Sequence, residues 1–590
     1  AWSYLSILWS DQQGEAWDGA NRTLLYVIAF CLFAFWQQRG RTAAIVLGAW
    51  TLAIIALAAI VLVRLPHQAN PLHSFLAYRL VAPVAYPNGN AATFLMALWP
   101  AVTLAARVEV PWWLRGVFAG GAVMLADVAL MSQSRGGVFT FPIVLILFFV
   151  LLPGRARLFA LAVPVAAAIA VTAPRVLHGA TRLRDGADPS STLSDIVTPI
   201  AIAALAVAAI VAVAAAIEAR TQVPEETGRR VQRAVGGVAI ACVLAGVIVG
   251  LAIAGDPVAR ARHAWHSFKT GPTLVQPKSG SRLSAGLGSH RYDFYRVALN
   301  RFKAHPLIGI GADNFSQDYL LYGRSHETPR YPHSIELRAL AQTGIVGSLL
   351  LLGAAAAALV AVLQAIRRAS PFGRAVAGGA AMVFVDWAVH GSFDWFWEFA
   401  GLGAPAFAML GLACALAPRP PGDRSSGALL RGVPGIAVGA VIAIVAGASL
   451  VLPWLAERDT KQAASSWTVD QSGAFDKLDQ AESLNPLSER PQLIAGTIAL
   501  RLGDLGRAER DFRASLRRNP RDSYAMLELG AIASATGRPV EALRLLERVR
   551  ALSPRDELAK RALQNVRTGK SVDIAQLNQQ ILTAANQLAR

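Results

Sequence analysis

The chain has 590 residues, of which 54% are hydrophobic, and a mean hydropathy of +0.41. Its apolar residues fall in long runs, which excludes an ordinary soluble protein and indicates a polytopic membrane protein. The net charge of +18 does not indicate nucleic-acid binding, because no module combining basic and aromatic residues is present. Membrane lipid headgroups or an anionic lipid-linked substrate fit this charge better.

Residues 1–22 precede the first apolar run and are expected on the outer side of the membrane. The chain starts at Ala1 without an initiator methionine, so we expect that an upstream helix has been omitted or removed. A cleaved signal peptide is the alternative.

The apolar runs predict about twelve membrane spans in an all-α fold. Transmembrane segments need about 20 apolar residues, and several of these runs are close to the lower limit of about 17. The predicted spans are 23–37, 42–63, 91–106, 115–131, 137–152, 158–173, 196–217, 235–254, 345–365, 374–392, 400–416 and 433–455. The domains expected from them are spans one to eight within 23–254, an outer loop over 255–344, and spans nine to twelve within 345–455.

The basic residues of alternate short loops set the expected orientation, since cytoplasmic loops retain positive charge during insertion. The long segments 64–90, 174–195 and 255–344 are expected outside, together with both termini. The loops expected in the cytoplasm contain Arg39, Arg41, Arg107, Arg115, Arg155, Arg157, Arg220, Arg229, Arg230, Arg233, Arg367, Arg368, Arg374, Arg419, Arg424 and Arg431.

The stretch 331–347, YPHSIELRALAQTGIVG, closes the outer loop and leads into the ninth span. His333 follows a proline and is expected at the start of a helix that runs to about Thr343 and is broken by Gly344. The positive end of that helix disfavours an imidazolium ion. His333 is therefore a candidate general base, with an interfacial histidine that caps the helix as the alternative.

Ionisable groups at a membrane boundary are costly and are candidates for function. Arg135 lies in a connection so short that its guanidinium must stay at the outer boundary, where it can grip a phosphate or snorkel to lipid headgroups. Arg79 lies on the same side. The segment 289–304 reads as an amphipathic interfacial helix with Tyr292, Tyr295, Leu299 and Phe302 broadly on one face, and its Arg291 and Arg296 are further candidates for substrate contact.

The cluster DWFWE between spans ten and eleven contains Asp394, Trp395 and Glu398. Aromatic faces and carboxylates suit a sugar-binding rim, while an aromatic belt at the membrane surface is the alternative. No paired-acid motif for a metal-bound sugar nucleotide and no zinc motif occurs, so neither a metal nor a cofactor is expected. The cysteines Cys31, Cys242 and Cys414 all lie in predicted spans, which argues against a disulfide framework.

In the tail, 456–590, the composition changes from apolar runs to mixed charged and apolar residues with helical periodicity. Alanines at 474, 508 and 542 and prolines at 486, 520 and 554 recur every 34 residues, which is the period of tetratricopeptide repeats. Gly503 and Gly537 are expected at turns, and 571–590 as a capping helix. The sequence therefore predicts an outer α-solenoid, serving either as a surface for a protein partner or as a structural lid.

The membrane part resembles the superfamily of O-antigen ligases and O-antigen polymerases, which are membrane glycosyltransferases. The most specific match is the ligase-type pattern of His, then Asn, Ser or Gln, nine residues, and Gly-x-x-Gly, here His333, Ser334, 335–343, Gly344 and Gly347. Supporting matches are LSILWSD, RLVAPVAYPNGNA, SRGG, the RxxxY motif before HPLIGIGADNF, and HGSFDWFWE. The chain departs from the pattern at Tyr295, where Trp is common, and in its repeat tail, which leaves the acceptor open.

The resemblance implies a GT-C-like bundle in the bacterial inner membrane that moves a glycan from undecaprenyl diphosphate to an acceptor hydroxyl on the outer side. It implies inversion at the anomeric carbon without a metal. His333 matches the family histidine proposed as base or acceptor-positioning residue, Arg135 and Arg291 match arginines expected to hold the diphosphate, and Arg79 and Asp394 match positions with less certain roles.

Three outcomes share this donor chemistry: a glycan ligase, a polymerase and a protein O-oligosaccharyltransferase, with a glycan, lipid or protein acceptor. Two other classes remain open. One is a polytopic transporter, although the long basic loop that ends in His333 fits transport poorly. The other is a scaffold that organises an envelope complex through its repeats.

Overall fold

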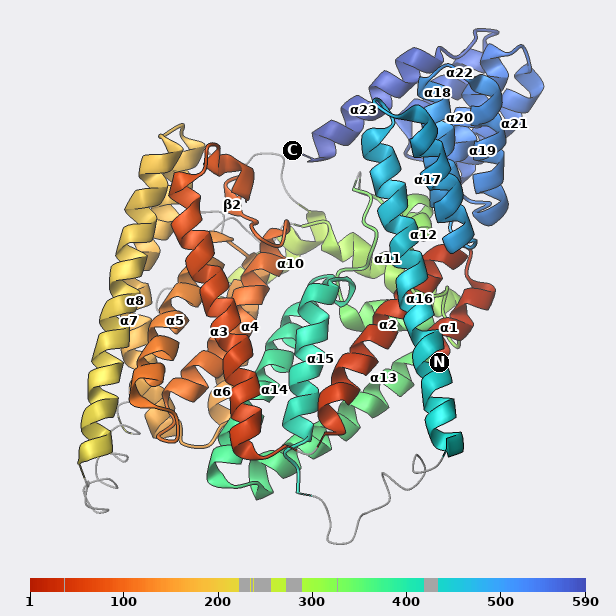
Figure 1. Ribbon diagram of the computed structural model, residues 1–590. Helices are drawn as coiled ribbons and strands as arrows, with labels where there is room; N and C mark the ends of the chain where they lie inside the picture. Colours follow the sequence, from red (N-terminus) through yellow and green to blue (C-terminus); the bar gives the residue numbers. More distant parts are fainter. Residues whose placement is uncertain are drawn as a thin grey trace.

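The computed structural model describes residues 1–36, 38–221, 256–271, 289–325, 327–418 and 433–589, together with positions 234 and 237. The described residues are almost entirely helical, which confirms the all-α prediction. Figure 1 shows a helical bundle and, at its upper right, a stack of shorter helices joined to it by α16.

The helices of the bundle overlap the predicted spans, although several extend well beyond the predicted bounds, and the span predicted at 235–254 lies outside the described residues. They are α2 (Gln13–Ala34), α3 (Gly40–Arg64), α4 (Pro87–Ala105), α5 (Trp112–Met131), α6 (Arg135–Leu151), α7 (Arg155–Arg184), α8 (Pro189–Arg220), α13 (Ile335–Arg368), α14 (Pro371–Gly391), α15 (Ala400–Cys414) and α16 (Val433–Ser466). Within the described residues, 7 helical segments are long and apolar enough to cross a membrane, and α6 and α15 are shorter apolar helices. The count of twelve spans stays a prediction.

Short elements connect these helices at one end of the bundle. They are α1 (Trp2–Leu5), η1 (Ser6–Trp9), η2 (Leu65–His67), η3 (Pro71–Ser74), β1 (Phe75–Leu76), β2 (Arg79–Leu80), α10 (Pro257–Thr270), α11 (Arg291–Ala304), α12 (Phe315–Tyr322) and η5 (Phe396–Glu398). The two strands form an antiparallel hairpin in which Leu76 pairs with Arg79.

Small residues set a close helix contact in the bundle between α5 and α8. A Cβ atom on Gly116 or Gly120 of α5 would lie 2.5 Å from the carbonyl oxygens of Ala208 and Ala204 of α8. Glycines four residues apart let two helix backbones approach in this way. Inside a membrane, where the hydrophobic effect does not drive helices together, such close packing stabilises their association. This contact fixes α8, and α7 beside it, against the core of the bundle.

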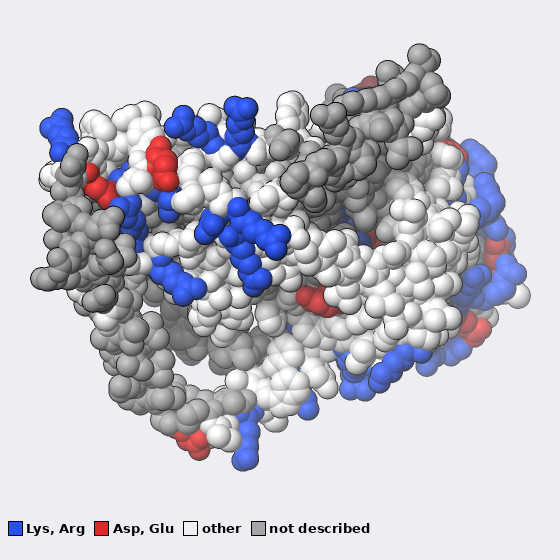
Figure 2. Space-filling model, turned by 90° about the horizontal axis from the view of Figure 1, so that it is seen from below, with Lys and Arg blue, Asp and Glu red and all other residues white. Residues whose placement is uncertain are grey.

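The described connections that are predicted to be cytoplasmic meet at one end of the bundle, whereas Arg229, Arg230, Arg233, Arg419, Arg424 and Arg431 lie outside the described residues. Arg157 at the start of α7 pairs with Glu218 at the end of α8 at 2.8 Å, and Arg115 of α5 pairs with the same carboxylate at 2.9 Å. Seen from below, this end carries many Lys and Arg side chains and few acidic ones (Figure 2). The repeat domain lies toward the opposite end (Figure 1).

The predicted helix break at Gly344 is present. Gly344 lies inside α13 with φ +64° and ψ −167°, and the helix changes direction there. The backbone groups left open by the break bind the segment 306–311: the amide of Ile345 donates to the Pro306 carbonyl at 2.8 Å, and the amide of Gly311 donates to the Gln342 carbonyl at 2.9 Å. The HPLIGIGA motif therefore completes the hydrogen bonding of the broken helix.

The predicted face of the helix at 289–304 is wrong. The helix exists as α11, but its buried face consists of Phe294, Val297 and Ala298, whereas Leu299 is 40% exposed. The physical reason is that α11 packs between α12 and α13 and does not lie on a flat interface. Phe294 is part of a small core with Phe315 and Tyr319 of α12 and with a residue of α13.

The tail is the predicted helical repeat domain. It consists of α17 (Gln471–Leu484), α18 (Arg490–Arg501), α19 (Leu505–Arg518), α20 (Ser523–Ala535), α21 (Pro539–Leu552), α22 (Glu557–Arg567) and the terminal α23 (Ile574–Ala589). The repeated alanines 474, 508 and 542 are fully buried. Gly503 and Gly537 have φ of +81° and +76° at the turns where they were expected. Helix α16 runs without a break through residue 456, where the domain boundary was predicted.

The repeat domain is docked on the bundle by two arginines. Arg521 pairs with Asp11 at 2.6 Å and with Asp318 at 3.0 Å. Arg555 donates to backbone carbonyls at the end of α12, including that of Tyr319 at 2.8 Å, and to the Ser325 carbonyl. The repeats therefore hold the end of α12 and the residues that lead to His333.

Candidate functional site

Asp394 is the centre of the candidate site. Its side chain is 1% exposed and lies just after α14, where the chain turns into η5. Arg291, the first residue of α11, pairs with it at 2.9 Å, and the Tyr86 hydroxyl and the Asn88 amide donate to it at 2.8 and 2.6 Å. Three segments that are distant in the sequence therefore meet at one carboxylate.

Arg79 extends this cluster from the hairpin. Its Nη2 donates to the Asn88 side chain at 2.8 Å, and its Nε donates to the Ser132 carbonyl at 3.1 Å. Ser132 belongs to the short connection between α5 and α6. The hairpin and this connection are thus fixed to each other beside the Asp394 carboxylate.

Arg135 is the first residue of α6, in the same connection. The Ser134 hydroxyl caps this helix by accepting from the Gly137 amide at 3.0 Å. Gln133 has φ of +45°, an uncommon value for a residue with a side chain. A Cβ atom on Gly136 would lie 2.7 Å from Nε2 of His390 on the last turn of α14, so the start of α6 is packed against the segment that leads to Asp394.

His333 lies immediately before α13 in a left-handed conformation, with φ of +59°. Its Nδ1 is 2.9 Å from the Tyr331 carbonyl. A carbonyl only accepts, so Nδ1 carries the hydrogen and Nε2 keeps its lone pair. The ring lies 5.1 Å from Phe294 and 6.1 Å from Trp395, measured between centroids. Strained conformations of this kind concentrate at functional sites.

Burial and neighbouring charges decide the ionisation of these groups. Burial lowers the pKa of His333, Arg291 lowers it further and Asp394 opposes both, with a net shift below the usual 6.5. Burial alone would raise the pKa of Asp394, but the Arg291 guanidinium holds it below its usual value. At neutral pH the site therefore contains a neutral imidazole near the ion pair of Asp394 and Arg291.

The aromatic residues form a wall on one side of the site. Trp395 stacks on Tyr331 with centroids 5.6 Å apart and an interplanar angle of 20°, and it contacts Tyr86 at 5.1 Å. Tyr331 and Trp395, together with His333 and Asp394, border a narrow crevice that contains about 140 Å³ of space between its atoms. This crevice is too tight for a ligand, since a ligand pocket usually offers at least about 300 Å³.

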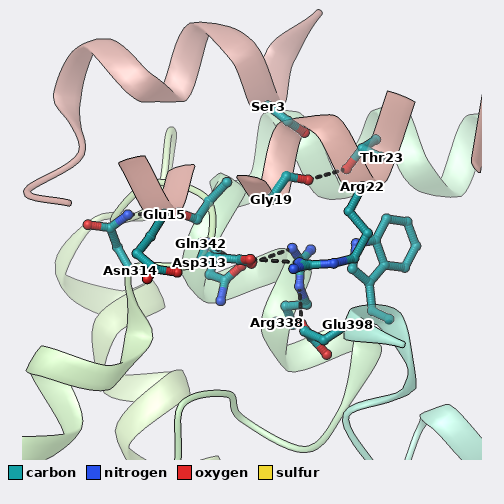
Figure 3. A network of polar contacts seen from close by, with 12 residues as sticks. Ser3, Glu15, Gly19, Arg22, Thr23, Asp313, Asn314, Arg338, Gln342 and Glu398 are labelled. Carbon is teal, nitrogen blue, oxygen red and sulfur yellow. Dashed lines mark hydrogen bonds and ion pairs between the residues drawn. The ribbon is translucent and has the colours of Figure 1, made fainter. Parts of the chain in front are cut away.

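A second polar network reaches the crevice through Arg338 and Glu398, which line it. Asp313 accepts from Arg22 at 2.6 Å and from Arg338 at 2.8 Å, and Arg338 also pairs with Glu398 at 2.6 Å. Figure 3 shows Asp313 facing both guanidinium groups, with Glu398 next to Arg338. Burial would raise the pKa of Asp313, but the two guanidinium groups hold it below its usual value. The network joins α2, the loop before α12, α13 and η5.

The structure brings together most of the residues predicted from the sequence. Arg79, Arg291, His333, Asp394 and Trp395 share one site, and Arg135 starts the helix next to it. Two predicted residues have other contacts: Arg296 pairs with Asp293 at 2.7 Å, and Glu398 belongs to the buried network.

Sequence reasoning missed Tyr86, Asn88 and Tyr331. Tyr86 and Asn88 belong to the same motif as Arg79, RLVAPVAYPNGNA, so a polar pair at the start of a span was the available signal. Asp313 and Arg338 were also missed. They lie in HPLIGIGADNF and in the stretch that contains His333, and their pairing depends on the broken helix.

The fold and the site identify the class of protein. It is a polytopic all-α membrane protein with a polar site at one end of its helical bundle and a docked repeat domain. The family model described as O-antigen ligase matches residues 197–352, which include Arg291 and His333. The model described as tetratricopeptide repeat matches residues 495–557. These matches confirm the predicted resemblance to O-antigen ligases and polymerases with a tetratricopeptide tail, and they support an O-antigen ligase-like function. A comparison with curated proteins gave no match.

Proposed function

We propose that this protein transfers a glycan from undecaprenyl diphosphate to an acceptor hydroxyl, at the outer face of the bacterial inner membrane. The observation that carries the proposal is the meeting of Arg79, Arg291, His333 and Asp394 beside the start of α6, at the end of the bundle opposite its basic connections. The O-antigen ligase match over 197–352 supports the reaction class.

The orientation follows from the charges of the two ends. We infer that the basic connections, including Arg115 and Arg157, remain in the cytoplasm during insertion, which supports an outer position for His333 and the repeat domain. A site at the bundle end lies at membrane depth where a lipid carrier presents its diphosphate. This geometry favours a lipid-linked donor over a soluble one.

In the proposed step, the acceptor oxygen attacks the anomeric carbon of the donor sugar. The new carbon–oxygen bond forms as the bond to the diphosphate breaks, and the diphosphate leaves with the bonding electrons. The acceptor proton passes to Nε2 of His333, which keeps its lone pair because Nδ1 donates to Tyr331. A single displacement of this kind inverts the anomeric configuration.

Arg79, Arg135 and Arg291 are the proposed partners of the diphosphate. Guanidinium groups match phosphate oxygens in a two-pronged geometry, and charge-assisted hydrogen bonds contribute about 1.5 to 3 kcal/mol each. They would stabilise the charge that develops on the leaving group, the role that a divalent ion performs in many enzymes using sugar nucleotides.

Substrate binding requires the crevice to open. The space of about 140 Å³ between its atoms does not admit a sugar diphosphate, and Arg291 is engaged by Asp394 at 2.9 Å. We propose that the diphosphate replaces Asp394 as the partner of Arg291. The Asp394 carboxylate is then available to accept a hydrogen bond from a hydroxyl group of the bound sugar, next to the exposed part of Trp395.

Arg296 and Glu398 are not included among the proposed substrate contacts, because Asp293 and Arg338 already engage them. The acceptor class is a glycan, a lipid or a protein. The docked repeats hold the segment that leads to His333, so an acceptor-bearing partner on the repeats would lie beside the site.

The experiment is a transfer assay with purified protein, carrier-linked glycan and candidate acceptors. His333→Ala should lower the transfer rate by about 100-fold to 10,000-fold, the usual contribution of a general base. His305→Ala is the matched control, since this histidine is exposed at the end of α11. Equal transfer rates for His333→Ala and the wild type would contradict the assignment.

A further inference from the structure

A polar groove lies between α7 and α8, two helices at the periphery of the bundle (Figure 1). This groove of about 490 Å³ separates the outer parts of these helices. Arg175, His178 and Arg182 line it from α7, and Ser194, Asp195 and Thr198 line it from α8. The spacings of three and four residues place the three basic residues on one face of α7.

Close helix packing forms the floor of the groove. A Cβ atom on Gly179 would lie 2.3 Å from Cδ1 of Ile196, so α7 and α8 touch at this level. Arg182 and Asp195 form a 2.9 Å ion pair across the groove. The polar side chains therefore line a concave surface with a fixed floor.

The position of the groove along α7 corresponds to the lipid headgroups. Arg155 starts the helix at the basic end of the bundle, and Arg175 follows 20 residues later, or about 30 Å along an α-helix. The hydrocarbon core of a bilayer is also about 30 Å thick. Residues 158–174 contain no Asp, Glu, Lys or Arg. Arg175 and His178 consequently lie at the opposite headgroup level.

The charge of the groove selects an anion. Arg182 and Asp195 neutralise each other, whereas Arg175 donates to the Val171 carbonyl of its own helix at 3.3 Å. In the described part of the chain, Arg175 has no carboxylate partner. Ser194 and Thr198 place hydroxyl groups on the facing wall, where the Ser194 hydroxyl donates to the Ser190 carbonyl of its own helix at 3.0 Å. A lipid phosphate satisfies this combination, because it brings acceptor oxygens and negative charge at headgroup depth.

We propose that the groove between α7 and α8 is a binding site for the phosphate group of a membrane lipid, separate from the site at Asp394. The phosphate lies between Arg175 and the hydroxyl groups of α8, and the glycerol or prenyl part follows the apolar surface below. An anionic phospholipid and a polyprenyl diphosphate share this chemistry. The proposal does not depend on the catalytic assignment.

The test is lipid retention measured by native mass spectrometry on the whole protein released from nanodiscs. One arm uses phosphatidylcholine with phosphatidylglycerol, and the other uses phosphatidylcholine with undecaprenyl diphosphate. Arg175→Gln should weaken retention of the bound lipid by about tenfold, the loss expected for a charge-assisted contact. Arg184→Gln is the matched control, since Arg184 ends the same helix but does not line the groove.

If Arg175→Gln loses lipid retention only in the phosphatidylglycerol arm, the ligand of the groove is a phospholipid. If it loses retention only in the undecaprenyl diphosphate arm, the ligand is the carrier lipid. Arg175→Lys keeps the positive charge and should retain part of the lipid binding. This variant therefore distinguishes loss of the charge from misfolding as the cause of weaker binding. Retention that is the same in Arg175→Gln, Arg184→Gln and the wild type in both arms would overturn the proposal.

Discussion

Replacement of Gly344 by alanine should disrupt the site without touching any residue proposed to contact substrate. Gly344 has φ +64° and ψ −167°, a region that essentially only glycine occupies. A Cβ atom there would lie 2.3 Å from the Leu307 carbonyl oxygen. This carbonyl is a backbone atom in the segment bound to the broken helix, so it cannot rotate away as a flexible side chain could.

Two contributions determine how much Gly344→Ala lowers the free energy of unfolding. Alanine in this conformation costs about 1 to 3 kcal/mol. Relief of the contact by moving 306–311 would break the bonds from Ile345 to Pro306 and from Val346 to Leu307, each with a net value of about 0.5 to 1.5 kcal/mol. We therefore expect Gly344→Ala to lower the free energy of unfolding by about 2 to 6 kcal/mol.

The assay compares this variant with Gly353→Ala by denaturant unfolding in detergent and by glycan transfer. Gly353 lies on the same helix, and a Cβ atom there meets nothing within 4 Å, so its replacement should be neutral or stabilising by up to about 1 kcal/mol. Gly344→Ala should also slow transfer more than tenfold, because His333 depends on the helix start. Wild-type stability and transfer in Gly344→Ala would refute this account of the motif.

Two further predictions concern the pH dependence and the repeat domain. The proposed base works in its neutral form and burial lowers the pKa of His333, so transfer should fall on acidification with a midpoint below pH 6.5. Asp394→Asn removes the charge that raises this pKa, and the midpoint of its residual activity should move lower; a rise would contradict the proposed electrostatics. Arg555→Ala should increase hydrogen exchange over 319–325 several-fold, because its guanidinium binds carbonyls there. Arg548→Ala, which removes a contact within the repeats, should leave exchange over 319–325 unchanged.

Much of the fold follows from local sequence patterns. The helix break at Gly344, the buried alanines of the repeats and the turns at Gly503 and Gly537 all reflect rules that act within a few residues. The site was predictable in part because the alternating charges of the connections place Arg79, Arg291 and Asp394 at one end of the bundle.

The remaining features depend on contacts between distant segments. Asp394 and Glu398 are neighbours in one short motif and both line the crevice, yet Asp394 pairs with Arg291 whereas Glu398, in a 3₁₀ turn, pairs with Arg338. Apolar residues occur on several sides of α11, so its periodicity could not identify the face that Phe294 buries against α12. Asp313 has its partners on α2 and α13, which no local pattern connects.

The central claim is that the site cleaves a diphosphate-linked glycan by direct displacement. The most direct measurement is the release of undecaprenyl diphosphate by the purified wild-type protein, in the presence of EDTA, together with the anomeric configuration of the product. The account predicts one carrier diphosphate released for each glycan transferred and an inverted linkage. Retention of configuration, or transfer that stops when divalent ions are chelated, would contradict it.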